Sequence, residues 1–464
     1  MSTYDLAVIG AGSAGFSAAI AAAETGARVA LVGSGTIGGT CVNVGCVPSK
    51  TLIRAMQGVQ DARTAGRFGG IRTNAAVADW AAAVTAKDAL VASMRQAKYV
   101  DLLPDYETID YIEGRARLTG DGVLVDGEPI AAPRVIVATG SRPAEPDIPG
   151  IGDVPWLDSS AALALQRLPE SLIIVGGGLI GCELAQMLAR ADVKVALACR
   201  TRLLPHAEPE ISEALSRYFV EEGLGVHAGI SYRSVRRNDA GVVLEIEGDS
   251  IATLRAEALV GAAGRLPNTE GLGLADLGIE IGADGGIRVD AQMRTARPGV
   301  YAAGDVTGRD MFVYMAAHGG RVAAHNALGG SAATYDDAAI PEVVFTDPQA
   351  ASVGLTEAVA RTLGRTVSTS ILPLDQLPRA LAARDTRGLI KLVADADTDQ
   401  LIGAHILAPE GGDSIQTAAL AIRQGLTVQE VARMVFPYLT TVEGVKLAAQ
   451  GFERDVTKLS CCAG

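Results

Sequence analysis

The stretch that decides the fold is YDLAVIGAGSAGFSAAIAAAETGARVALV, residues 4–32. An apolar run turns on Gly10, Gly12 and Gly15, continues into an alanine-rich segment and ends in a second apolar run. This order predicts a βαβ unit in which the glycines allow a tight turn, close approach to a pyrophosphate and close helix packing. An ordinary strand-to-helix turn is the alternative, and the complete βαβ context argues against it.

The same spacing returns in SLIIVGGGLIGCELAQMLARADVKVALACRTR, residues 171–202, at Gly176, Gly178 and Gly181. Two dinucleotide-binding units in one chain imply two different dinucleotides, one held tightly and one that exchanges. The sequence therefore predicts an α/β protein with two Rossmann-like domains.

The acidic residue that usually ends the second strand and binds a ribose is missing from both units. Gly33 takes its place in the first unit, where Ser34 or a water must hold the ribose instead. In the second unit Cys199 takes the place and Arg200 and Arg202 follow. Arginines pair with a 2′-phosphate, which favours NADPH over NADH, and a merely solvated turn is the alternative.

Composition limits the class of protein. The chain has 464 residues, enough for about three domains, and a net charge of −13, which disfavours nucleic acid as a partner. Its first residues lack the pattern of a secretory signal, and charges interrupt the alanine-rich stretches, so that none of these stretches can span a membrane. Six cysteines are too few for a secreted fold held together by disulfides. We therefore expect a cytoplasmic protein that does not bind a membrane.

A cysteine pair lies just after the first βαβ unit, in GGTCVNVGCVPSK, residues 38–50. Cys41 and Cys46 could form half of a zinc site, but no second half-site follows at a suitable distance. Near the start of a helix, and with Lys50 one turn further on, such a pair has a lowered thiolate pKa. Next to a dinucleotide site, this arrangement is typical of redox chemistry.

These motifs, together with ATGSRP, YAAGD and VVFTDPQAASVG in that order, resemble the flavin-dependent pyridine nucleotide-disulfide oxidoreductases over essentially the whole chain. The resemblance implies FAD in the first unit, NADPH in the second and a C-terminal α+β dimerisation domain. The implied FAD-binding domain has two parts, residues 1–150 and 266–334. The implied NADPH-binding domain lies between them, at residues 151–265, and the dimerisation domain follows at residues 335–464.

The resemblance also implies roles for individual residues. Cys41 and Cys46 match the redox-active disulfide, with Cys46 as the thiolate beside the flavin, and Lys50 and Glu183 match an ion pair near its reactive nitrogen. Asp305 matches the residue that binds the ribityl chain, although from its position alone it could equally cap a helix. The further positions matched to cofactor binding are Gly39, Thr40, Thr139 and Gly140.

Two C-terminal features narrow the choice within this family. Disulfide reductases of the family carry a catalytic histidine where this chain has Phe436, in FPYLTTVEG (436–444). The chain also ends in KLSCCAG, with adjacent Cys461 and Cys462. Thiolates without a proton donor suit a soft metal ion such as Hg(II), which favours two sulfur ligands.

Together these features resemble the mercuric reductases of the family. That resemblance implies that Tyr99 and Tyr438 lie beside the inner metal site. It also implies that Cys461 and Cys462 of one subunit take mercury from thiol complexes and pass it to Cys41 and Cys46 of the other, so that the homodimer is required. Many relatives begin with an extra metal-binding domain, and we expect this chain to be a form without it.

Two other functions remain open at this point. One is a disulfide reductase with a different acid–base arrangement, and the other is a non-catalytic thiol protein that sequesters mercury. Cys182 and Cys199, the remaining cysteines, are interpreted as packing residues of the second unit.

Overall fold

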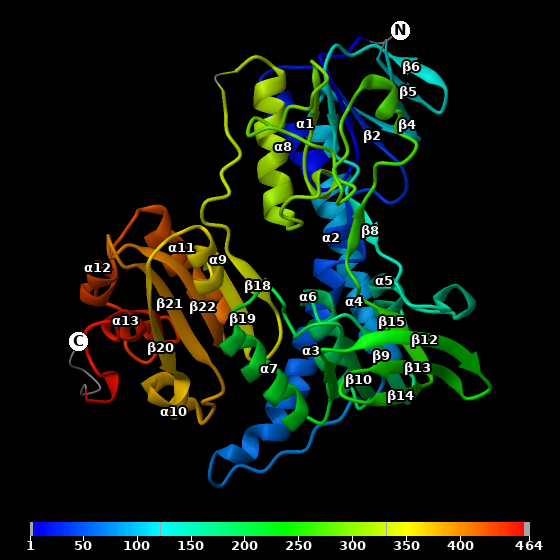
Figure 1. Cartoon of the computed structure of the whole chain (residues 1–464). Coiled ribbons are helices and arrows are strands. Elements are labelled where there is room, and N and C mark those ends of the chain that lie inside the picture. The colour runs from blue at the N-terminus through cyan, green and yellow to red at the C-terminus, as the bar shows by residue number, and fades with distance from the viewer. Residues whose placement is uncertain (1–2, 121, 331, 459–464) are drawn as a thin grey trace.

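The computed structural model describes residues 3–120, 122–330 and 332–458. Figure 1 shows three lobes: the first βαβ unit lies around α1 and β2, the second around β9 and α6, and the C-terminal residues form the third. The first two lobes each contain a parallel sheet, as the sequence predicts. The α/β class with two Rossmann-like units is thereby confirmed.

The first lobe is built on a five-stranded parallel sheet with the order β17-β7-β1-β2-β3. Its central strand β1 is completely buried, and helices α1 and α8 pack against each other beside it (Figure 1). The strands β4, β5 and β6 form a small antiparallel sheet at the edge. The elements are β1 (Leu6–Ile9), α1 (Ser13–Ala23), β2 (Val29–Gly33), β3 (Ile109–Glu113), β4 (Ala116–Thr119), β5 (Gly122–Val125), β6 (Glu128–Ile130), β7 (Val135–Val137), β17 (Val300–Ala302) and α8 (Val313–Ala327).

The second lobe repeats this plan with four parallel strands in the order β11-β10-β9-β15. An antiparallel sheet of three strands, β12-β13-β14, packs its buried valine and leucine side chains against it. The elements are α5 (Ser159–Leu163), β9 (Ser171–Val175), α6 (Leu179–Arg190), β10 (Lys194–Cys199), α7 (Pro209–Glu221), β11 (Gly225–Ala228), β12 (Ser231–Asn238), β13 (Gly241–Glu247), β14 (Ile251–Ala256) and β15 (Ala258–Gly261).

The third lobe is a five-stranded antiparallel sheet in the order β18-β19-β22-β21-β20, with α11 packed against β19 and β22 and α13 against β20 and β21. This α+β arrangement agrees with the expected dimerisation domain. The elements are β18 (Glu342–Val344), β19 (Gln349–Gly354), α9 (Glu357–Thr362), β20 (Val367–Pro373), α10 (Pro378–Ala383), β21 (Leu389–Asp395), β22 (Leu401–Ala408), α11 (Gly411–Arg423), α12 (Val428–Arg433) and α13 (Glu443–Gln450).

Two features join the lobes. The long helix α3 (Cys46–Thr64) packs against α6 of the second lobe (Figure 1). Leu52 and Met56 of α3 enter the same core as Leu184 of α6. A two-stranded ribbon connects the first two lobes, and the short helix α2 and the helix α4 flank α3. These elements are α2 (Gly39–Asn43), α4 (Trp80–Arg95), β8 (Ser141–Pro143) and β16 (Arg265–Pro267).

The two glycine turns have the same backbone shape. Gly10 and Gly176 have φ angles of 118° and 117°, in a region that favours glycine. A Cβ atom at Gly10 would lie 2.1 Å from the carbonyl oxygen of Ala138, and one at Gly176 would lie 2.2 Å from that of Ala262. Both turns therefore require glycine for conformation and for space.

Among the described residues, no helix combines the length and the apolar character that crossing a membrane requires.

Candidate active site

One large cavity, about 1960 Å³ in volume, extends along both glycine turns. Single small-molecule sites usually measure roughly 300–1,000 Å³, so this space suits two extended ligands that meet. Gly10 and Gly12 line one part of it and Gly176 and Gly178 another. Gly39, Thr40, Thr139 and Gly140 line it as well.

The third glycine of each turn lies under the cavity rather than in its wall. A Cβ atom at Gly15 would lie 1.7 Å from the Gly10 carbonyl oxygen, and one at Gly181 would lie 1.8 Å from that of Gly176. These glycines let α1 and α6 approach their strands, which brings each helix N-terminus to the cavity.

The cysteine pair lies in this cavity, on two consecutive helices. Cys41 is on α2, Cys46 is the first residue of α3, and both are free thiols of intermediate exposure. A hydrogen bond from the Cys41 thiol and the positive charge of Lys50 lower the pKa of Cys46 to about 7, against opposing burial. The same hydrogen bond raises the pKa of Cys41 above its usual range. At neutral pH the pair is therefore one thiol and one partly ionised thiolate.

The predicted ion pair beside Cys46 is present. Lys50 Nζ lies 2.6 Å from Glu183 Oε2, although the two residues are 133 positions apart in the chain. The other carboxylate oxygen of Glu183 accepts a hydrogen bond from the Phe345 backbone N–H at 2.9 Å. The Glu183 side chain is 5% exposed, and Lys50 also lies over the Phe345 ring, 5.0 Å from its centroid. Residues from all three lobes therefore fix the charge beside the thiolate.

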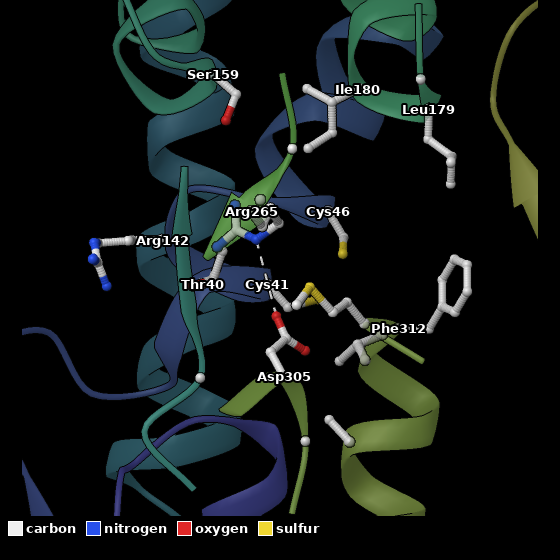
Figure 2. A pocket seen from close by; sticks show the side chains of 18 of the residues that line it. Thr40, Cys41, Cys46, Arg142, Ser159, Leu179, Ile180, Arg265, Asp305 and Phe312 are labelled. Carbon is white, nitrogen blue, oxygen red and sulfur yellow. Dashed lines mark ion pairs between the residues drawn. The ribbon is translucent and has the colours of Figure 1, made fainter. Parts of the chain in front are cut away.

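Asp305 lies in the wall of the cavity and has two partners that the sequence did not indicate. Ser141 Oγ donates a hydrogen bond to Asp305 Oδ2 at 2.5 Å and accepts one from Arg265 Nε at 2.8 Å. Figure 2 shows Arg265 near the cysteine pair, with its ion pair to Asp305 at 4.0 Å drawn as a dashed line. Gly304, not Asp305, occupies the cap position of the short helix that begins here, so the capping alternative is wrong.

Arg265 belongs to this site and was not singled out by any sequence motif. Burial lowers the pKa of its guanidinium, and the charges of Asp305 and Cys46 oppose that shift. Its only sequence signal is its place after the last strand of the second lobe, where the chain returns to the first. It adds a cation to the site in which Cys46 ionises.

Tyr99 lies near the cysteine pair but outside the cavity wall. It packs edge-on against Phe16, with ring centroids 4.9 Å apart. Burial raises the pKa of Tyr99, a hydrogen bond with Ser13 lowers it, and the charges of Cys41 and Cys46 raise it further. This position is compatible with a role beside the pair.

Tyr438 lies on the third lobe, 48% exposed, and does not line the cavity of its own chain. Next to it, Val435 is 97% exposed, while Phe436 packs on the apolar core of that lobe. Cys461 and Cys462 lie outside the described residues.

The two arginines of the second unit differ. Both line the cavity, but the Arg202 guanidinium donates hydrogen bonds to the backbone oxygens of Pro205 and Ala207, at 3.1 and 2.7 Å. Arg202 thus holds its own loop, and Arg200, which is exposed, remains to meet an anionic group. His206 lines the same part of the cavity.

The missing acid of the first unit has a structural explanation. A Cβ atom at Gly33 would lie 2.6 Å from the Tyr111 hydroxyl and 2.9 Å from the Ala11 side chain. Tyr111, on the neighbouring strand β3, fills the space of a larger residue. Ser34, which follows directly, lines the cavity as expected for a residue that holds a ribose.

Comparison with known families agrees with this geometry. Residues 4–324 match the family model for pyridine nucleotide-disulphide oxidoreductases, and residues 340–449 match the dimerisation domain of the same family. The chain belongs to this family. A mercuric reductase of Streptomyces lividans is 46% identical over 99% of this chain and 98% of its own length. A mercuric reductase of Staphylococcus aureus is 44% identical over 99% of this chain and 84% of its own length.

Solved structures give the same fold. The HOCl-induced flavoprotein disulfide reductase RclA from Escherichia coli superposes with a TM-score of 0.85 at 29% identity, over 96% of this chain and 99% of its own. LpdA from Mycobacterium tuberculosis superposes with a TM-score of 0.84 at 28% identity, over 97% and 100%. The two curated relatives described above, at 46% and 44% identity, are mercuric reductases.

Proposed function

We propose that this protein is an NADPH-dependent flavoenzyme that reduces Hg(II) to elemental mercury in a detoxification reaction. One observation carries the proposal: the Cys41/Cys46 thiol pair, in which the pKa of Cys46 is lowered to about 7, lies in the cavity that extends along both dinucleotide turns. Its curated relatives at 46% and 44% identity are mercuric reductases.

The residues present fit FAD in the first unit and NADPH in the second. In each turn the first and third glycines leave no room for a Cβ atom, and the turn brings a helix N-terminus to the cavity, as a pyrophosphate requires. Asp305 offers a carboxylate for the hydroxyls of a ribityl chain, and Arg200 a cation for a 2′-phosphate. When bound, these cofactors supply the two-electron chemistry.

The protein supplies the sulfur chemistry. The Cys46 thiolate attacks a mercury bis-thiolate and displaces one carrier thiolate, and Cys41 displaces the second and gives its proton to the leaving sulfur. The metal ion is then held by two protein sulfurs in the cavity. Lys50 and Arg265 stabilise the negative charge that these steps involve, while Glu183 holds Lys50 in place.

No step of this exchange needs a histidine. Phe436 takes the position of the family's catalytic histidine and packs into an apolar core. The histidines that line the cavity are His206 and His405, and neither is among the groups that shift the pKa of Cys46. His405 is buried with its Nε2 atom 3.1 Å from the Leu355 oxygen.

The homodimer gives the remaining residues their roles. We propose that Tyr438, Cys461 and Cys462 of one subunit complete the site of the other subunit. That subunit contributes Tyr99 and the Cys41/Cys46 pair. The exposed segment around Val435 agrees with a subunit contact there. We assign the FAD-binding domain to residues 1–150 with 266–334, the NADPH-binding domain to residues 151–265 and the dimerisation domain to residues 335–464. We also propose that the protein is located in the cytoplasm.

The deciding experiment measures NADPH oxidation that depends on a mercury–glutathione complex and traps the volatile product. We expect about one mercury atom evolved for each NADPH consumed. Stoichiometric mercury binding without NADPH oxidation would instead support the sequestering protein. Fast turnover of oxidised glutathione or lipoamide without a mercury response would support the disulfide reductase.

A further inference from the structure

A second thiol pair lies at the second glycine turn. Cys199 is the last residue of β10, and Cys182 lies in the first turn of α6. Neither takes part in the reaction proposed above. Of the four free cysteines among the described residues, these two are the buried ones.

Both sulfurs border one residue, Gly177, in the middle of the turn. The Cys182 thiol donates a hydrogen bond to the Gly177 carbonyl oxygen, with 3.4 Å between sulfur and oxygen. A Cβ atom built on Gly177 would lie 2.8 Å from the Cys199 sulfur. The proximity of Cys199 also contributes to the raised pKa of Cys182, so the two thiols are electrostatic neighbours.

The pair can be approached from the cavity. Cys199 is 4% exposed and belongs to the cavity wall, together with Gly176, Gly177 and Gly178. Cys182 is fully buried behind it. A soft metal ion that enters the second glycine turn therefore meets the Cys199 thiol first, and the buried Cys182 thiol borders the same residue, Gly177.

We propose that Cys199 and Cys182 form a second mercury-capturing site, which is open when the nicotinamide dinucleotide is absent and closed when it is bound. The choice of metal ion rests on the proposed function, which brings Hg(II) into this cavity. Two sulfur ligands suffice for an ion that prefers linear dithiolate coordination. The site lies at the second glycine turn, which holds the pyrophosphate of NADPH. Mercury and NADPH therefore cannot be bound there at the same time.

The capture takes two balanced exchanges. In the first, the Cys199 sulfur bonds to mercury, one carrier thiolate leaves, and the Cys199 proton goes to that leaving sulfur. In the second, Cys182 displaces the other carrier thiol in the same way. No electrons are transferred. Both protein thiols start protonated, because each donates a hydrogen bond and burial raises the pKa of Cys199 to about 11. Capture is therefore slower than at Cys46, and it matters when mercury exceeds NADPH.

This site predicts a specific form of inhibition. Mercury added before NADPH blocks the second glycine turn, while mercury added after NADPH is reduced at the first cysteine pair. The order of addition then decides the outcome.

The test uses the full-length, FAD-loaded quadruple variant C41S/C46S/C461S/C462S, in which Cys182 and Cys199 are the only cysteines left of six. The probe is HgCl₂ with two equivalents of glutathione, followed by desalting and measurement of total mercury per flavin. We expect one mercury per chain. With NADP⁺ at ten times its Kd, the rate of mercury uptake should fall about tenfold, in proportion to the fraction of protein whose second glycine turn is unoccupied.

Changing Cys182→Ser in this background keeps a hydrogen-bond donor for Gly177 but removes the second sulfur. Retention against added glutathione should then fall roughly a hundredfold, because the chelate is lost. Flavin content reports on folding in each variant. Absence of bound mercury, or uptake that NADP⁺ leaves unchanged, overturns the proposal. Neither result bears on mercury reduction by the wild-type enzyme, which is measured separately.

Discussion

The described residues include two thiol pairs, each beside one of two nearly identical glycine turns, and only the first of these pairs contains a sulfur with a lowered pKa. Cys46 begins a helix, accepts a hydrogen bond from Cys41 and faces Lys50, and its pKa is lowered to about 7. Cys199 ends a strand, donates to the Thr201 carbonyl oxygen, and its pKa is raised to about 11 by burial. The difference teaches that a hydrogen bond donated by the partner thiol and the charge of one cation, rather than the glycine turn that both pairs share, create the nucleophile.

The largest expected effect comes from removing the reactive sulfur. Cys46→Ser should lower mercury-dependent NADPH oxidation by about a thousandfold or more, because the other thiols that line the cavity, Cys41 and Cys199, have raised pKa values and remain protonated at neutral pH. Steady-state assays with a mercury–glutathione complex measure this, and the flavin absorbance confirms that the cofactor is still bound. Activity within tenfold of wild type would mean that the reactive pair lies elsewhere.

The two glycine turns are alike, so equal changes should have equal structural costs but different functional results. Gly10→Ala and Gly176→Ala each push a Cβ atom into a carbonyl oxygen, at a φ angle that alanine avoids. Strain of this kind costs roughly 1–3 kcal/mol, or about tenfold to a hundredfold in ligand affinity. Gly10→Ala should lose FAD on dialysis, while Gly176→Ala should retain FAD and show a raised KM for NADPH. The same cofactor lost in both variants would contradict the assignment of the two units.

Removing the cation should make the reactive pair more like the buried one. In Lys50→Met the pKa of Cys46 should rise from about 7 toward its ordinary value near 9, because the positive charge no longer favours the thiolate. Alkylation by iodoacetamide at pH 7 should slow about tenfold, and the midpoint of its pH profile should move upward. In wild type, alkylation should fall as the pH drops through about 7.

A matched control for this change is Arg28→Met, which removes a cation from an exposed ion pair with Asp110. Its alkylation profile should equal that of wild type. An unchanged profile in Lys50→Met would show that the Cys41 hydrogen bond alone sets the acidity.

The smallest expected effect separates the two arginines of the second unit. Arg200→Gln should weaken the preference for NADPH over NADH about fivefold, because an exposed charge contributes roughly 1 kcal/mol to phosphate binding. Arg202→Gln should change this ratio less, since its guanidinium is engaged by backbone oxygens of its own loop. The ratio of kcat/KM for the two nucleotides measures both. A larger change in Arg202→Gln would reverse the assignment.

The sequence reveals the parts of this fold that depend on local pattern. Both glycine turns could be predicted because their spacing, the flanking strands and the helix lie within about thirty consecutive residues. The pairing of Lys50 with Glu183 spans 133 positions, and only the family resemblance indicated it. Propensity and spacing contain no information on such distant pairs.

The remaining surprises come from side chains that meet only in three dimensions. Arg265 approaches the thiol pair because the chain crosses back between lobes at that residue. Gly33 lacks an acidic side chain because Tyr111, from another strand, occupies the space. Arg202, predicted as a phosphate ligand, donates through one guanidinium nitrogen to carbonyl oxygens of its own loop. Each outcome depends on packing between segments that are distant in the sequence.

Glu183 has a consequence for how this protein can evolve. Its two carboxylate oxygens bind Lys50, on the helix that leaves the first lobe, and a backbone amide of the third lobe, while its own helix α6 belongs to the second lobe. A mutation at any of the three boundaries between lobes that shifts one lobe also alters the electrostatic potential at the Cys46 sulfur. Residues far from the chemistry are thereby placed under selection for acidity as well as for stability.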